Sequence, residues 1–160
     1  MQRVNTKAVI IVTIIIAFLG GLWAFRESTP SEKPLADQTK DERVMTIRAR
    51  FAEAASMVRV VSPAENGQVG EPLKVTGFAK EEWYARDKTF QIELHDQQGN
   101  ILTTALASVS GEGSDGFVPF TAVITYVKPA TDTVGKLVFK KANPSGDPEK
   151  DREYAQSVSF

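Results

Sequence analysis

The chain has 160 residues, a formal net charge of −1 and no cysteine. This length accommodates one ordinary domain plus an appendage, and the balanced charge gives no sign of a nucleic-acid partner. Without cysteine, the chain cannot form disulfides, thiolate metal sites or a cysteine nucleophile. Because His95 is the single histidine, a histidine-rich metal site is also excluded. Any chemistry must therefore come from carboxylates, hydroxyls, lysine or arginine.

An uncharged apolar run, AVIIVTIIIAFLGGLWAF, occupies residues 8–25. As a helix it would span about 27 Å at about 1.5 Å per residue, close to the thickness of a bilayer's hydrocarbon core. A buried soluble helix would need a larger surrounding core than this chain can supply. We therefore expect residues 1–26 to form an uncleaved transmembrane signal-anchor. A cleaved signal peptide is the alternative, although bulky residues precede the candidate cleavage position at Ala24.

Basic residues lie on both sides of this apolar segment. Arg3 and Lys7 precede it, and four Lys or Arg residues follow within about 20 residues. A count of positive charges therefore does not fix the orientation. The short basic tail is typical of a signal-anchor, which leaves the N-terminus inside. We expect a single-pass plasma-membrane protein whose C-terminal domain is extracytoplasmic.

Residues 27–57 are interpreted as a polar tether. Residues 27–41 contain two prolines and many polar side chains, which favours an extended chain. After Asp41, a candidate N-cap, the residues Val44, Ile47 and Phe51 follow helical spacing. The pattern allows a short amphipathic helix close to the membrane or a loosely helical stalk without a partner.

From Val58 onward, apolar residues alternate with polar ones, which is typical of strands. Turn signals rich in Gly, Pro, Asn and Asp separate the alternating runs. Seven short strands at regular spacing predict an all-β, antiparallel β-sandwich of two sheets. The expected strands are 58–62, 73–79, 90–96, 101–107, 117–127, 134–141 and 154–160. Trp83 and Tyr84 precede the third strand, where they can fill the space between the sheets.

Four stretches carry a more specific resemblance: VVSPAENGQVGEPLKVTGFA, WYARDKTFQIELHDQQGNIL, DGFVPFTAVITY and GKLVFKKANPSGDPE. In order and spacing they resemble the bacterial spore-germination immunoglobulin-like domain, the second of the domain families found alongside the GerMN module. FVPF before an alternating strand and NPSG-x-P near the end are the distinctive pieces. The resemblance covers residues 58–160 and implies an immunoglobulin-like fold for them, behind one transmembrane helix.

Two loops invite a comparison with ligand-binding motifs. Oxygen-bearing side chains alternate through residues 143–151, as in a calcium loop, but Pro144 and Pro148 interrupt that arrangement. The glycine-rich loop 111–116 lacks the lysine and the following helix of a phosphate loop. Ordinary turns explain both loops more simply than ligand-binding motifs do. We therefore expect no catalytic residue, no metal and no cofactor.

The remaining interpretation is a non-catalytic module that docks a protein partner or a cell-envelope component, with association between copies of the chain as a related alternative. A carbohydrate-binding module would need exposed aromatic side chains, and a wall hydrolase would need two facing carboxylates. The aromatic candidates are Trp83, Tyr84, Tyr126 and Tyr154. The candidate contact loops are 63–71, 110–117 and 142–152. The residues singled out in them are Asn66, Ser114, Asp115, Asn143, Ser145 and Asp147.

Overall fold

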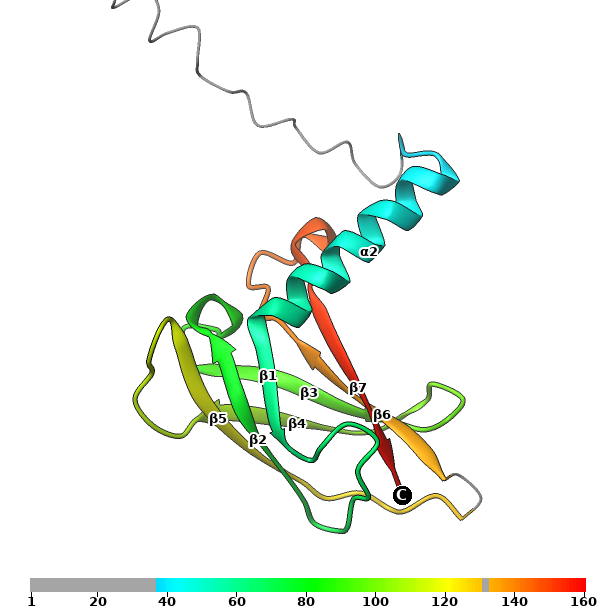
Figure 1. Ribbon diagram of the computed structural model, residues 1–160, viewed down its shortest axis with the longest axis vertical. Coiled ribbons are helices and arrows are strands. Elements are labelled where there is room, and N and C mark those ends of the chain that lie inside the picture. The colour runs from blue at the N-terminus through cyan, green and yellow to red at the C-terminus, as the bar shows by residue number, and fades with distance from the viewer. Residues whose placement is uncertain (1–36, 131–132) are drawn as a thin grey trace, which may run out of the picture. The chain divides into compact units, whose positions relative to one another are not determined.

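The structure is a computed structural model that describes residues 37–130 and 133–160. Its elements, shown in Figure 1, are α2 (Lys40–Met57), β1 (Val58–Ser62), β2 (Leu73–Lys80), η2 (Glu81–Trp83), β3 (Thr89–His95), β4 (Ile101–Val109), β5 (Phe117–Ile124), β6 (Val134–Lys140), η3 (Pro148–Lys150) and β7 (Glu153–Ser159). The predicted transmembrane segment, residues 1–26, lies outside the described residues. Within the described ranges, no helix combines the length and apolar character needed to cross a membrane.

All seven strands belong to one antiparallel sheet in the order β1-β2-β5-β4-β3-β6-β7. The predicted sandwich of two separate sheets is therefore wrong. The two halves are joined where Ser108 and Val109 of β4 pair with Thr121 and Phe120 of β5. These two β4 residues lie just beyond the strand end expected from the sequence, at residue 107. Alternation identifies the faces of a strand but not its neighbours, so the joining contact was not predictable from it.

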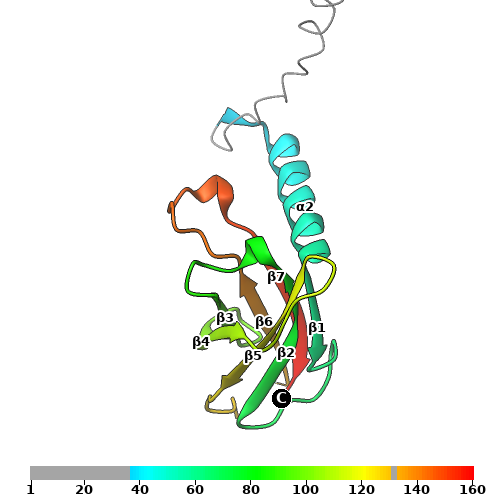
Figure 2. The same cartoon turned by 90° about the vertical axis from the view of Figure 1, so that its left-hand side faces the viewer.

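The sheet curves almost into a barrel, and a loop closes the remaining margin between β1 and β7 (Figure 2). The backbone N–H groups of Asn66 and Val69 donate to the carbonyls of Ser157 and Ser159, each at 2.8 Å. The Gln156 side chain adds a 2.8 Å hydrogen bond to a backbone carbonyl in the same loop. Pairing by a loop thus satisfies backbone groups that an open edge would leave to solvent.

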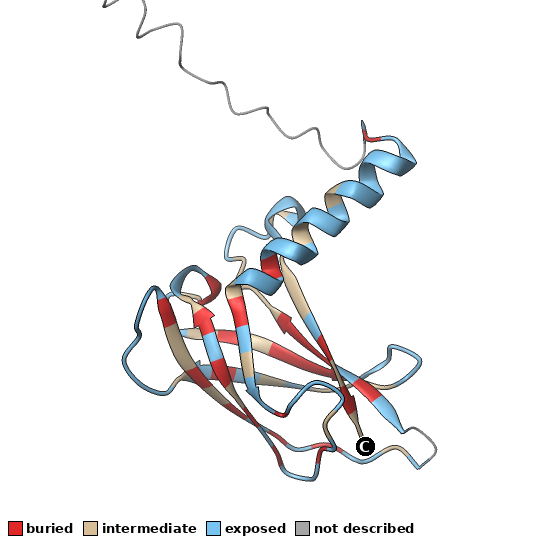
Figure 3. Cartoon of the chain, viewed as in Figure 1, coloured by how far each residue is buried: buried red, intermediate tan, exposed pale blue. Residues whose placement is uncertain are grey.

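Aromatic side chains make up much of the buried core of the sheet. Figure 3 shows the buried positions distributed along the strands. Phe120 meets Phe90 edge-on, with ring centroids 5.0 Å apart, and lies 6.0 Å from Phe139. Trp83 is fully buried. The Tyr84 hydroxyl donates to the carbonyl of Val118 at 2.8 Å, and burial raises the pKa of Tyr84 to about 12. The fold therefore uses these aromatics for packing.

Helix α2 begins at a capping box and runs directly into β1. The N-cap is Thr39 rather than the predicted Asp41, because Thr39 and Glu42 satisfy each other's backbone N–H groups, as a capping box requires. Only the last turns pack on the sheet, where Ala54 is fully buried. Val44, Ile47 and Phe51 remain substantially exposed.

Candidate functional site

The convex face of the sheet carries a row of polar side chains from β3 and β6. On β3, residues 90, 92 and 94 face the core, so Gln91, Glu93 and His95 face outward. The antiparallel register places Gln91 opposite Lys140 and His95 opposite Lys136. This face is polar by sequence pattern, yet the Glu93 side chain is only 5% exposed. A buried carboxylate on an outer face requires compensating partners.

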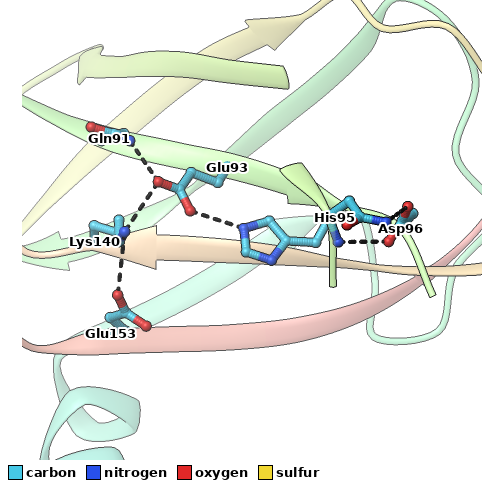
Figure 4. Close-up of polar contacts among 7 residues, drawn as sticks. Gln91, Glu93, His95, Asp96, Lys140 and Glu153 are labelled. Carbon is cyan, nitrogen blue, oxygen red and sulfur yellow. Dashed lines mark hydrogen bonds and ion pairs between the residues drawn. The ribbon is translucent and has the colours of Figure 1, made fainter. Parts of the chain in front are cut away.

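Figure 4 shows those partners gathered around the Glu93 carboxylate. Gln91 Nε2 donates to Oε1 at 2.7 Å, and Lys140 Nζ donates to the same oxygen at 3.1 Å. His95 Nε2 lies 2.9 Å from Oε2, and an ionised carboxylate only accepts, so this nitrogen carries a proton. Lys140 also pairs with Glu153 of β7 at 3.4 Å. The network thus ties three neighbouring strands together.

The hydrogen bonds and ion pairs of this network keep Glu93 and Lys140 ionised despite their burial. Burial acts to raise the pKa of Glu93, but the hydrogen bonds from His95 and Lys140 outweigh it and hold that pKa below 4.5. For Lys140, burial acts to lower the pKa, while Glu93 and Glu153 raise it above 10.5. Both groups are therefore ionised at neutral pH. A general acid needs a carboxyl with a raised pKa, so Glu93 is unsuited to that role.

A hollow of about 360 Å³ opens beside the network, and we call it the Arg152 groove. It combines apolar, amide and charged side chains drawn from the β2–β3 connection, β3, β4, the end of β6, the β6–β7 connection and the start of β7. Its lining residues are Ala85, Thr89, Phe90, Gln91, Leu106, Lys140, Lys141, Ala142, Asn143, Asp151, Arg152 and Glu153. Two further hollows, of about 330 and 160 Å³, share Arg152 with it. The smaller one is bounded by Ile47, Arg50 and Phe51 of α2.

Arg152 holds the wall of the groove together. Its Nε donates to Oε2 of Glu53 on α2 at 2.7 Å, and its Nη1 donates to the carbonyls of Glu149 and Asp151 at 2.8 and 3.1 Å. The side chain is only 17% exposed. Because Glu53 lies 99 residues earlier in the chain, no local sequence pattern could have indicated this contact.

The predicted residues of the 142–152 loop mainly serve the loop itself. Asn143 Nδ2 donates to the carbonyl of Asp147 at 2.8 Å and to Oδ1 of Asp151 at 2.7 Å. Ser145 donates to Asn143 at 2.7 Å, and Asp147 caps η3 through the amide of Glu149. In the part of the chain that the structure describes, no three His, Asp or Glu side chains are grouped as metal ligands would be. Asn143 and Ser145 still line hollows beside Arg152.

The other predicted residues lie in separate loops. Asn66 has a φ of 58° in the loop that closes onto β7. Ser114 and Asp115 form the tight β4–β5 turn, in which Ser114 exchanges two backbone hydrogen bonds with Phe117 and Asp115 has a φ of 55°. Neither hollow that contains Asn143 includes any of these three residues. The structure therefore does not join the six candidates into one site.

The aromatic candidates for a sugar-binding platform are not available for stacking. Trp83, Tyr84 and Tyr126 are buried in the core. Tyr154 is partly buried and packs on Phe139, with centroids 5.6 Å apart. Three of these four rings are therefore buried and the fourth is partly covered, so they do not form an exposed aromatic platform.

A family model described as an immunoglobulin-like domain of bacterial spore germination matches residues 57–147, more than half of the chain. Comparisons with curated proteins and with solved structures gave no match. The matched region runs from the end of α2 through the turn at Asn143, so it includes most of the Arg152 groove. The chain therefore belongs to the family of immunoglobulin-like domains of bacterial spore germination.

Proposed function

We propose that this chain is a non-catalytic binding module of the cell envelope that docks a protein partner in the Arg152 groove. Membership of an immunoglobulin-like family fits a binding module in general. The observation that carries the proposal is the composition of the groove, in which an apolar side chain, Leu106, lies among amides and charges of both signs. A mixture of apolar, amide and charged side chains is typical of surfaces that bind other proteins reversibly.

Lys140 is the more exposed of the groove's two lysines, at 37%, but Lys141 is the less tightly paired. The Lys141 side chain is 23% exposed, and its nearest carboxylate is on Glu82, at 4.0 Å. Lys140, by contrast, is committed to Glu93 and Glu153. A partner with an acidic side chain could therefore pair with Lys141 at little cost to the fold.

We also propose that residues 1–26 anchor the chain in the plasma membrane with the binding module outside. The support is the uncharged apolar run at 8–25, followed by a polar linker. Because the chain has no cysteine, a Ser114→Cys variant provides one label site on an exposed turn. A membrane-impermeant maleimide should label it in intact cells. Labelling only after permeabilisation would contradict the proposed orientation.

The docking proposal can be tested by photo-crosslinking from Ser145, which lines a hollow beside Arg152. The crosslinker is introduced into the full chain in its native membranes. Lys141→Glu should strongly reduce the crosslinked partner, whereas Lys74→Glu, an equal charge change on an exposed residue of β2, should leave it unchanged. Equal yields from the two variants would refute docking in the groove. Capture of wall glycan in place of protein would instead support a cell-wall ligand.

A further inference from the structure

The sheet is open along part of its central strand, β4, where β4 and β5 separate. Along one side, β4 pairs with β3 from Ser108 back to Ile101. On the other side, only Ser108 and Val109 pair with β5. Over the described chain, residues 101–107 thus have no ladder partner on the side away from β3. Alternate residues of an antiparallel strand direct their N–H and C=O groups to each side, so several of these groups are available for pairing.

The open strand has one irregularity, at Leu102, where its register with β3 shifts, and otherwise lacks the features that usually protect an edge. Its sequence, ILTTALASV, has nine residues and contains no charge, proline or glycine. Ile101 and Leu106 are 56% and 65% exposed, and Thr104 is also exposed. Natural sheets normally blunt such an edge with a charged side chain, a proline, a bulge or a cover. Beyond this irregularity, residues 103–107 form a regular, uncharged stretch with no ladder partner on the side away from β3, and such an edge favours the addition of another strand.

The two outer strands of the sheet, β1 and β7, are protected. β1 has five residues, carries Arg59 and ends before Pro63. The free side of β7 receives backbone hydrogen bonds from Asn66 and Val69. Strand addition is therefore expected at β4 and not at the β1–β7 margin.

We propose that β4 pairs in antiparallel fashion with β4 of a second copy of this chain, giving a two-fold symmetric dimer with one sheet continuing through both copies. Antiparallel self-pairing is isologous, because one strand supplies the donors and acceptors of both sides, and it closes after a single contact. The absence of charge in β4 fits self-pairing, since no like charges meet across the axis. The proposal does not depend on docking in the Arg152 groove.

Disulfide trapping in the full chain tests this pairing, because every introduced cysteine is the only one present. Thr103→Cys, Thr104→Cys and Ala105→Cys scan the centre of the strand. The matched control is Val61→Cys, which is 62% exposed on β1. After mild oxidation of membranes, at least one scanned position should yield roughly tenfold more disulfide-linked dimer than the control, because paired strands hold symmetry-related Cβ atoms about 5 Å apart.

A second measurement uses charge in place of covalent trapping. In detergent, wild type and Val61→Lys should sediment at twice the protein mass of 17.5 kDa, whereas Thr104→Lys should sediment as a monomer. In a Trp23→Phe background, unchanged fluorescence of buried Trp83 will verify that Thr104→Lys is folded. The proposal is overturned if no scanned cysteine exceeds the Val61→Cys control, if wild type is monomeric, or if the β4 cysteines link to a different protein. Failure of the groove proposal is separate, because Lys141 is not on this margin.

Discussion

Replacing Lys140 by Met should destabilise the domain much more than replacing Lys88 by Met. The two ion pairs have nearly the same length, 3.1 Å from Lys140 to Glu93 and 3.0 Å from Lys88 to Glu81. They differ in burial, because the Glu93 side chain is 5% exposed and the Glu81 side chain is 74% exposed. Removing Lys140 leaves a buried carboxylate short of one charged donor, which costs about 1.5–3 kcal/mol. His95 still donates to Glu93, so we expect about 2 kcal/mol.

The exposed pair provides the comparison. Loss of the Lys88–Glu81 contact should cost about 0–1 kcal/mol, since exposed ion pairs contribute little. Urea unfolding of the full chain in mild detergent, followed by the fluorescence of Trp83 in a Trp23→Phe background, gives both free energies of unfolding. Equal losses in the two variants would refute the argument that burial of Glu93 makes its partners important.

Three further outcomes are expected. The pKa of Glu93 is lowered in the folded state. Its contribution to stability is therefore present above the unfolded pKa near 4.5 and is lost as the pH falls through the folded pKa. Because Lys140 helps to lower this pKa, NMR titration should show a higher pKa for Glu93 in Lys140→Met than in wild type. Gly77→Ala should lower stability by about 1–3 kcal/mol in the same urea assay, because its Cβ would lie 2.4 Å from a β1 carbonyl oxygen, whereas Gly70→Ala, with open space around it, should not. Phe120→Ala should cost about 3–5 kcal/mol through the cavity it leaves, and Phe78→Ala, 42% exposed, much less; similar losses would contradict the assignment of the core.

Local patterns predicted those features that depend on neighbours along the chain. In β2, Leu73, Val75 and Ala79 alternate with polar or exposed positions, and all three are buried. The helical spacing of Val44, Ile47 and Phe51 does lie within α2. This spacing did not reveal that these side chains stay exposed, because burial depends on what packs against a helix and not on its periodicity alone.

Features that join distant segments could not be read from the sequence. The Arg152–Glu53 pair, the closure of the loop onto β7 and the joining of β4 to β5 each depend on chain topology. Glu93 shows the same limit. Alternation puts Gln91 and His95 on the same strand face as Glu93, but its charged partner Lys140 lies 47 residues later, on β6.

The open strand and the groove are neighbours on one surface, because Leu106 belongs to β4 and also lines the Arg152 groove. An axis that relates two antiparallel β4 strands runs perpendicular to the sheet, so both grooves of the dimer would lie on the same face. Two grooves on one face allow a partner with two contact sites to bind with avidity. Thr104 lies opposite Glu93 but does not line the groove, so Thr104→Lys should leave the crosslink from Ser145 detectable while weakening the retention of such a partner. A loss of retention without any change in the mass of the protein would show that Thr104 acts on the groove directly.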